Sequence, residues 1–186
     1  MTYHFNNSRA SVNKDEPVHL TKFIATFVLP PPLREKYGAE LLTEQIKKVG
    51  GLTLDKLPET VEQLYRFHKR RFAGTVVETN VDLETSFEVN IDEQLVMYPY
   101  NIMKDWAKLI YDPHTGFQAL KKDYTGSLTL EVHNKVGDVI RNMYFPIIFP
   151  ITPPNQWDLE YANEAIYEMS ITFAAENPTD LVIGTW

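Results

Sequence analysis

The residues from Gly126 to Pro150, GSLTLEVHNKVGDVIRNMYFPIIFP, decide the fold class of this chain. Two runs of alternating apolar and polar residues flank the polar segment NKVGD, whose glycine is typical of a tight turn. The second run ends in the strongly apolar segment MYFPIIFP. The stretch therefore predicts a long antiparallel hairpin, and its length raises the question of what pairs with its outer edges.

Further strands are predicted on both sides of this hairpin. Residues 22–32, KFIATFVLPPP, predict a strand that ends at three prolines, because proline cannot donate to a strand ladder. Residues 74–80 and 83–91 predict a second hairpin, and residues 164–176 predict a last strand. In residues 83–91 the alternation places one set of side chains on a single face, namely Thr85, Phe87, Val89 and Ile91.

One helix is predicted, over residues 99–111, where apolar residues recur at helical spacing. We expect Trp106 to anchor it in the core and Asn101 to cap its N-terminus. Residues 39–51 fit either a short helix or a strand. Residues 54–74 favour a long connection with some helical turn, in which the basic run HKRR forms a solvated loop.

Together these segments predict a mainly β fold of six or seven strands. We expect a β-sandwich or a curved antiparallel sheet with the helix of residues 99–111 packed against it. Residues 1–21 are polar and lack periodicity, which predicts a flexible or partner-ordered N-terminal arm. Residues 22–186 then form one β domain.

The amino-acid composition and charge argue against several classes of function. The 186-residue chain carries a net charge of −7, and a general nucleic-acid binder would be basic instead. It has no cysteine, so neither disulfides nor thiolate chemistry are expected, which fits synthesis in a reducing cytosol. No apolar run is long enough to cross a bilayer, and the N-terminus lacks the pattern of a secretory signal.

Motifs for catalysis or cofactor binding are missing from the sequence. There is no G-x-S-x-G, no phosphate-binding glycine loop and no metal-binding spacing among the five histidines, so no cofactor is expected. His133 and Glu131 share a strand face, where a solvent-facing pair is the simplest interpretation. A C-terminal acidic set is typical of surface charge because it lacks the calcium-loop spacing; it consists of Asp158, Glu160, Glu164 and Glu168.

Four segments in order resemble the tail tube proteins of contractile-tailed bacteriophages, a family that is similar to the inner-tube protein of type VI secretion. The segments are KFIATFVL with EQIKKVGGLTLDKLP, YRFHKRRFAGTVVETNVDLETSFEVNIDE, NIMKDWAKLIYDPHTG, and the stretch from Gly126 to Ala174. The resemblance extends over about Lys22 to Ala175. The N-terminal arm, the LPPP segment and the tail NPTDLVIGTW depart from the family pattern.

The resemblance implies a β-sandwich-like subunit that assembles into hexameric rings, whose inner strands join into one ring-shaped β-barrel. Stacked rings would form the inner tail tube, through which phage DNA passes on ejection without specific binding. The protein would then be a structural virion protein of the tail, made in the host cytoplasm, without enzymatic activity or membrane insertion. Its partners would be further copies of itself and the tail sheath, baseplate and tail-terminator proteins.

Under this resemblance, we expect polar segments outside the core to contact neighbouring subunits or adjacent rings. The arm before Lys22 is one such segment. The candidate contact residues are His68, Lys69, Arg70, Arg71, Asn134, Lys135, Asp138 and Trp157, while Trp106 is the core anchor.

Other functions stay open at this point. A tube-initiating baseplate protein, a tail terminator or the secretion-system tube would have the same fold. A β-sandwich carbohydrate-binding module is a different class of function, and its stacking residues would be Tyr98, Tyr100, Trp157 and Tyr161.

Overall fold

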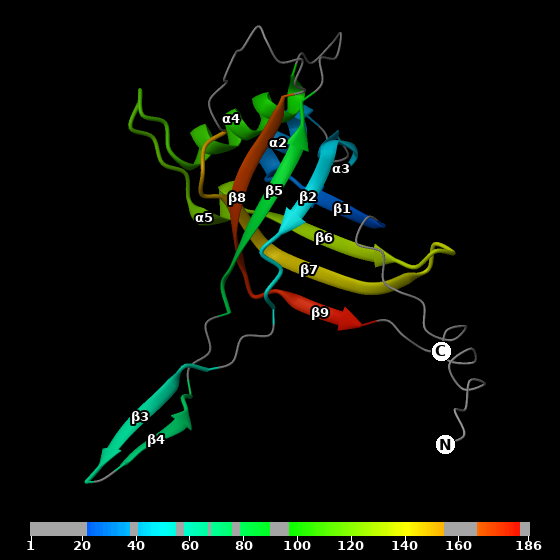
Figure 1. Cartoon of the computed structure of the whole chain (residues 1–186). Coiled ribbons are helices and arrows are strands. Elements are labelled where there is room, and N and C mark those ends of the chain that lie inside the picture. Colours follow the sequence, from blue (N-terminus) through cyan, green and yellow to red (C-terminus); the bar gives the residue numbers. More distant parts are fainter. Residues whose placement is uncertain are drawn as a thin grey trace, which may run out of the picture.

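The computed structural model describes residues 22–37, 41–54, 58–66, 68–75, 79–89, 97–154 and 167–182. These residues form a mainly β, antiparallel structure, which confirms the predicted fold class (Figure 1). The strands are β1 (Phe23–Val28), β2 (Ile46–Gly50), β3 (Thr60–Tyr65), β4 (His68–Ala73), β5 (Val81–Glu88), β6 (Gly126–His133), β7 (Val139–Pro150), β8 (Glu168–Glu176) and β9 (Thr179–Val182). The helices are α2 (Pro31–Tyr37), α3 (Leu41–Gln45), α4 (Tyr98–Ile110) and α5 (Lys121–Tyr124).

Seven strands form one sheet in the order β1-β6-β7-β8-β5-β2, with β9 added beside β7. The long strand β7 joins two parts of this sheet. One edge of β7 pairs with β6, while the other pairs with β9 over 141–144 and with β8 over 147–150. As a consequence, β1, β6, β7 and β9 run across the direction of β2, β5 and β8 (Figure 1). The sheet therefore folds over itself into two layers.

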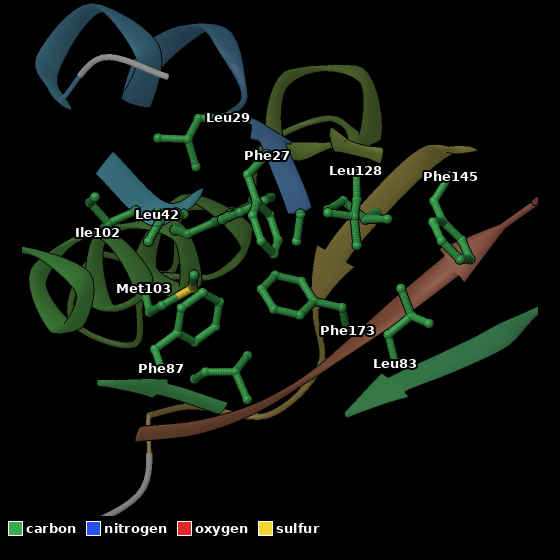
Figure 2. Packing of buried hydrophobic residues seen from close by; sticks show 14 of the residues in the cluster. Phe27, Leu29, Leu42, Leu83, Phe87, Ile102, Met103, Leu128, Phe145 and Phe173 are labelled. Carbon is green, nitrogen blue, oxygen red and sulfur yellow. The ribbon is translucent and has the colours of Figure 1, made fainter. Parts of the chain in front are cut away.

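The core lies between these two layers. The centroid of the Phe27 ring on β1 is 5.7 Å from the ring centroid of Phe87 on β5 and 5.9 Å from that of Phe173 on β8. Figure 2 shows these three rings around one centre, with Met103 of α4 close by. Alternation places the other side of each strand in solvent, as in β5, where Val81, Leu83, Thr85 and Phe87 are buried and the residues between them are not.

Helix α4 packs on this core through Trp106. The indole is fully buried, its ring lies 5.6 Å from that of Phe173, and its Nε1 donates to the carbonyl of Tyr124 at 2.7 Å. The prediction of a core anchor in a helix is thus confirmed. The predicted cap at Asn101 is wrong, because the helix begins earlier, after Met97 in the left-handed region at φ 58°, with Pro99 in its first turn.

Close packing around Trp106 also explains the glycine that begins β6. A Cβ atom on Gly126 would lie 2.5 Å from the carbonyl oxygen of Val28 and 3.1 Å from Cη2 of Trp106. Only glycine allows β1, β6 and the indole to approach this closely.

The structure confirms several predicted elements and corrects others. The strand before the prolines, the hairpin of residues 126–150 and the last strand are present, and residues 39–51 contain both a helix and a strand. The predicted hairpin of residues 74–80 with 83–91 is wrong, because β5 lies between β2 and β8. The helical turn expected in residues 54–74 is also wrong, since its described part forms β3 and β4. The first error arose because alternation fixes which face of a strand is buried but not which strand it pairs with.

Candidate assembly surfaces

The strands β3 and β4 form a separate two-stranded hairpin that projects from the rest of the molecule (Figure 1). The sequence predicts a basic loop here, whereas His68, Lys69, Arg70 and Arg71 lie in strand β4. Register places Arg71 opposite Glu62 and Arg70 opposite Gln63, so the two arginines are on opposite faces of the ribbon.

Ion pairs hold one face of this hairpin together. Arg71 Nε donates to Glu62 Oε1 at 2.8 Å, and Lys69 Nζ donates to Glu62 Oε2 at 3.3 Å. These side chains are exposed, so each pair contributes only ~0.2–1 kcal/mol. The ion pairs alone therefore explain little of the stability that the hairpin needs.

Large apolar side chains of the hairpin are in solvent. Val61 is 58% exposed, Leu64 is 76% exposed and Phe72 is 46% exposed. An isolated two-stranded hairpin is only marginally stable in water, and clustered exposed apolar side chains are typical of interaction sites. By register Val61 and Phe72 share one face of the ribbon and Leu64 lies on the other, so both faces are candidate contact surfaces.

The turn of the β6–β7 hairpin uses two of the other candidate residues for its own structure. Asn134 Oδ1 accepts hydrogen bonds from the backbone N–H groups of Val136, Gly137 and Asp138, and Asn134 Nδ2 donates to Asp138 Oδ2 at 3.1 Å. Gly137, at φ 105°, allows the chain to reverse. This turn presents Val136, which is 84% exposed, at its tip.

His133 and Glu131 have the geometry of structural residues and not that of a reactive pair. His133 Nδ1 lies 3.0 Å from the carbonyl oxygen of Gly137, and its Nε2 lies 3.7 Å from Glu131 Oε2. Both side chains are half-buried, not solvent-facing as the sequence suggested. The histidine thus braces the turn that follows β6.

The remaining sequence candidates divide into buried residues and residues that lie outside the described ranges. Tyr98 is buried and Tyr100 is half-buried, so Tyr98 cannot offer an open ring to a sugar. Trp157, Tyr161, the arm before Lys22 and most of the acidic set lie outside the described residues, and Glu168 lies in β8.

The described part of the chain has surface hollows but no metal-binding cluster. It contains no group of three or more His, Asp or Glu residues that could hold a metal ion. A shallow polar trough of about 520 Å³ runs along the outer face of β2, β5 and β8, and a smaller apolar groove of about 270 Å³ lies between β6 and β2. No helix among these residues has the length and apolar character needed to span a membrane.

The β3–β4 hairpin is not among the elements predicted from the sequence, although a signal for it is present. TVEQLY and HKRRFA are separated by two residues, and each alternates across the ribbon. Four basic or histidine residues in a row are unusual for a strand and concealed this pattern.

Comparison with known proteins relates the fold to contractile injection machines. No protein-family model matches the sequence, and no curated protein is similar to it in sequence. Among solved structures, the tube-terminating cap of the anti-feeding prophage is similar with a TM-score of 0.62 at 16% identity, covering 91% of this chain and 93% of that chain. A chain of the PVC sheath–tube complex in its extended state has a TM-score of 0.59 at 14% identity, covering 98% and 100%.

A third similar structure comes from the same kind of assembly. The PVC sheath/tube terminator in the extended state has a TM-score of 0.56 at 16% identity, covering 90% of this chain and 99% of that chain. This protein therefore has the fold of tube, cap and terminator components of contractile injection systems. At such identities the likeness establishes the fold alone.

Proposed function

We propose that this protein is a structural component of a contractile injection machine and forms its inner tube by self-assembly. Hexameric rings of the subunit would stack into a tube inside a sheath, as in a phage tail or a related injection system. If the machine is a phage tail, DNA would pass through the lumen of this tube. The sheath, baseplate and terminator proteins would be its partners.

The observation that carries the proposal is the projecting β3–β4 hairpin on a fold that otherwise has its own core. Its exposed Val61, Leu64 and Phe72 need a partner surface, and the chain is similar over 98% of its length to a chain of a sheath–tube complex. Head-to-tail contacts between identical subunits generate closed rings or open helical filaments. The hairpin is thus proposed as a contact to the next subunit or ring, with His68, Lys69, Arg70 and Arg71 at that interface.

The other sequence candidates are proposed as secondary contacts. Lys135 and the exposed Val136 lie at the tip of the β6–β7 turn, whose shape Asn134 and Asp138 maintain. Trp157 and the N-terminal arm are proposed to contact neighbours as well, because Trp157 stands in a proline-rich segment and the arm is long and polar.

Electron microscopy of the purified protein tests the proposal. We expect rings and tubes at high subunit concentration, and a protein that stays monomeric at all concentrations would contradict the proposed function. Arg70→Glu is a more specific test. Arg70 lies opposite Gln63, so its substitution leaves the Glu62–Arg71 ion pair intact. It should raise the concentration needed for assembly, whereas Lys104→Glu, which makes the same charge change on α4, should not.

A tube terminator is the second candidate function, and the similarity to the prophage cap favours it. Tube subunits stack on themselves, whereas a terminator forms one ring that ends a tube made by another protein. Tubes of many rings from the pure protein would support the tube subunit. Single rings that never stack, and that bind to the ends of a separate tube protein, would support the terminator.

A further inference from the structure

The outer face of β2, β5 and β8 differs from the other surfaces of the molecule. Register places Lys48 beside Ser86, Ser86 opposite Ser170, and Glu84 opposite Thr172. All of these side chains point away from the core, because the alternate residues of β5 and β8 are buried. We name this face the polar wall; it consists of Lys48, Glu84, Ser86, Glu168, Ser170 and Thr172.

Exposed large apolar side chains of the described residues lie elsewhere, apart from Ile151, whose backbone N–H donates to the carbonyl of Thr172 at the border of the wall. They are found on β1, on the β3–β4 hairpin, in the 111–120 segment, at the β6–β7 turn, and on and just after β7: Ile24, Val61, Leu64, Phe72, Tyr111, Phe117, Leu120, Val136, Tyr144 and Ile151. The buried centres of subunit interfaces are enriched in apolar and aromatic side chains. Subunit contacts are thus expected on those elements, and the polar wall is left in contact with water.

The edges and ends of the three strands fit a wall that is shared between copies. Among the described residues β2 pairs only with β5, so its other edge is available to a strand of a neighbouring copy. The β3–β4 hairpin leaves from the end where β2 stops at Gly50 and β5 starts at Val81 (Figure 1). Side-by-side strand pairing would therefore extend the wall within a ring, while the hairpin reaches beyond its end.

We propose that the polar wall lines the channel of the assembled tube and is the surface past which cargo moves. This inference rests on the proposed function. It predicts that neither a neighbouring subunit nor an outer partner covers the face of the wall, which meets a neighbour only along the edge of β2, and that the trough of about 520 Å³ along it stays filled with water.

The charges of the wall suit a channel that does not hold polyanions. Lys47 Nζ lies 2.7 Å from Glu88 and 3.2 Å from Glu168, so the basic group at this end is already paired with carboxylates. By alternation, five carboxylates (Asp82, Glu84, Glu88, Glu168 and Glu176) lie on the outer face of the three strands with two ammonium groups (Lys47 and Lys48), which leaves a net charge of −3. Like charges repel phosphate, and short serine and threonine side chains offer little apolar surface.

Single cysteines test this assignment directly, because the chain has none of its own. Ser86→Cys and Ser170→Cys place a thiol on the wall, and Ser127→Cys places one on the outer face of β6 as a matched control. In dispersed subunits each thiol should react with both a small maleimide and a bulky polyethylene-glycol maleimide. In assembled tubes the wall thiols should react with the small reagent and be shielded from the bulky one.

The Ser127→Cys control should not distinguish the small maleimide from the bulky one. A thiol outside the channel reacts with both reagents, and a thiol in a subunit contact reacts with neither. Tubes whose wall thiols react equally with the bulky reagent, or with neither reagent, would overturn the assignment and leave the tube function standing. Subunits that never assemble would overturn both.

A charge change provides a second measurement. Glu84→Lys should leave the concentration needed for assembly unchanged within about twofold, because Glu84 faces the channel and no neighbour. A loss of assembly in Glu84→Lys would place this face in a subunit contact and contradict the proposal.

Discussion

At the scale of single residues, Asp105 connects α4 to α2. Its Oδ2 accepts hydrogen bonds from Lys36 Nζ and from the hydroxyl of Tyr37, both at 2.6 Å. Burial opposes ionisation of the carboxyl, but the bonds from Lys36 and Tyr37 outweigh it and hold the pKa of Asp105 below its ordinary value of 3.8. The hydrogen bond to Asp105 raises the pKa of Lys36 in turn, and burial is the main cause that raises the pKa of Tyr37.

This pKa shift predicts a pH dependence of stability. A carboxyl whose pKa is lower in the folded than in the unfolded state stabilises the fold above pH 3.8, and that contribution disappears as the pH falls through the folded pKa. Asp105→Asn should therefore lower the free energy of unfolding by ~1 kcal/mol at pH 7 and by less at pH 3, which lies below the ordinary pKa of 3.8. Urea unfolding at the two pH values measures this, and an equal loss at both would contradict the role assigned to the charge.

A second prediction at this scale concerns the glycine beside Trp106. Gly126→Ala would force a methyl group against the Val28 carbonyl and the indole, so we expect a loss of ~1–3 kcal/mol in the free energy of unfolding. Gly50→Ala is the control, because a Cβ there meets its nearest neighbours at 3.7 Å, which is ordinary contact. Thermal unfolding of both variants measures this difference in stability. Equal stabilities would mean that the close approach at Gly126 does not affect the stability of the fold.

At the scale of elements, the β3–β4 hairpin is set apart from the sheet. Its strands pair only with each other within the described residues, and every side chain of β4 is exposed. By contrast, β5 lies between two strands and buries every second residue. Local stability follows burial, so these two elements should open with very different free energies.

Hydrogen exchange measures that difference. In dispersed subunits the amides of β3 and β4 should exchange rapidly, and those of β5 and β8 should be protected. On assembly, protection should rise in the hairpin by tenfold or more, because a contact worth ~1.4 kcal/mol changes an opening equilibrium tenfold. Unchanged exchange of the hairpin in assembled tubes would remove it from the proposed interface, while β5 serves as the internal reference.

At the scale of the whole molecule, the two layers of the sheet share one core. Phe173 links them, since its ring lies near that of Phe27 on β1 and that of Trp106 on α4. Strand β7 also pairs with strands of both layers. Neither layer has a separate core on which it could remain folded alone.

The shared core predicts one cooperative unfolding transition. Phe173→Ala should lower the free energy of unfolding by ~3–5 kcal/mol, because it leaves a cavity between the layers. Far-ultraviolet and near-ultraviolet circular dichroism should report the same midpoint in the wild type and in the variant. Two separate transitions would indicate that the layers fold independently.

The fold class, the buried faces and the helix could be predicted from local sequence patterns alone. Alternation identified the buried side of β5 and β8, and helical spacing identified Trp106 as a core residue, because both periods follow directly from backbone geometry. The hairpin of residues 126–150 was predicted for the same reason, since its two strands are adjacent in the chain and joined by a tight turn.

Only the tertiary structure decided which strands are neighbours and which surfaces remain for other chains. The pairing of β5 with β8 joins segments far apart in sequence, and no local pattern encodes it. The same holds for the candidate site. The basic run was noticed in the sequence, but its place on an isolated projecting strand, and the separation of the polar wall from the apolar surfaces, depend on how the sheet folds over itself. Local periodicity sets what each element buries, whereas contacts between distant segments set what the molecule leaves exposed.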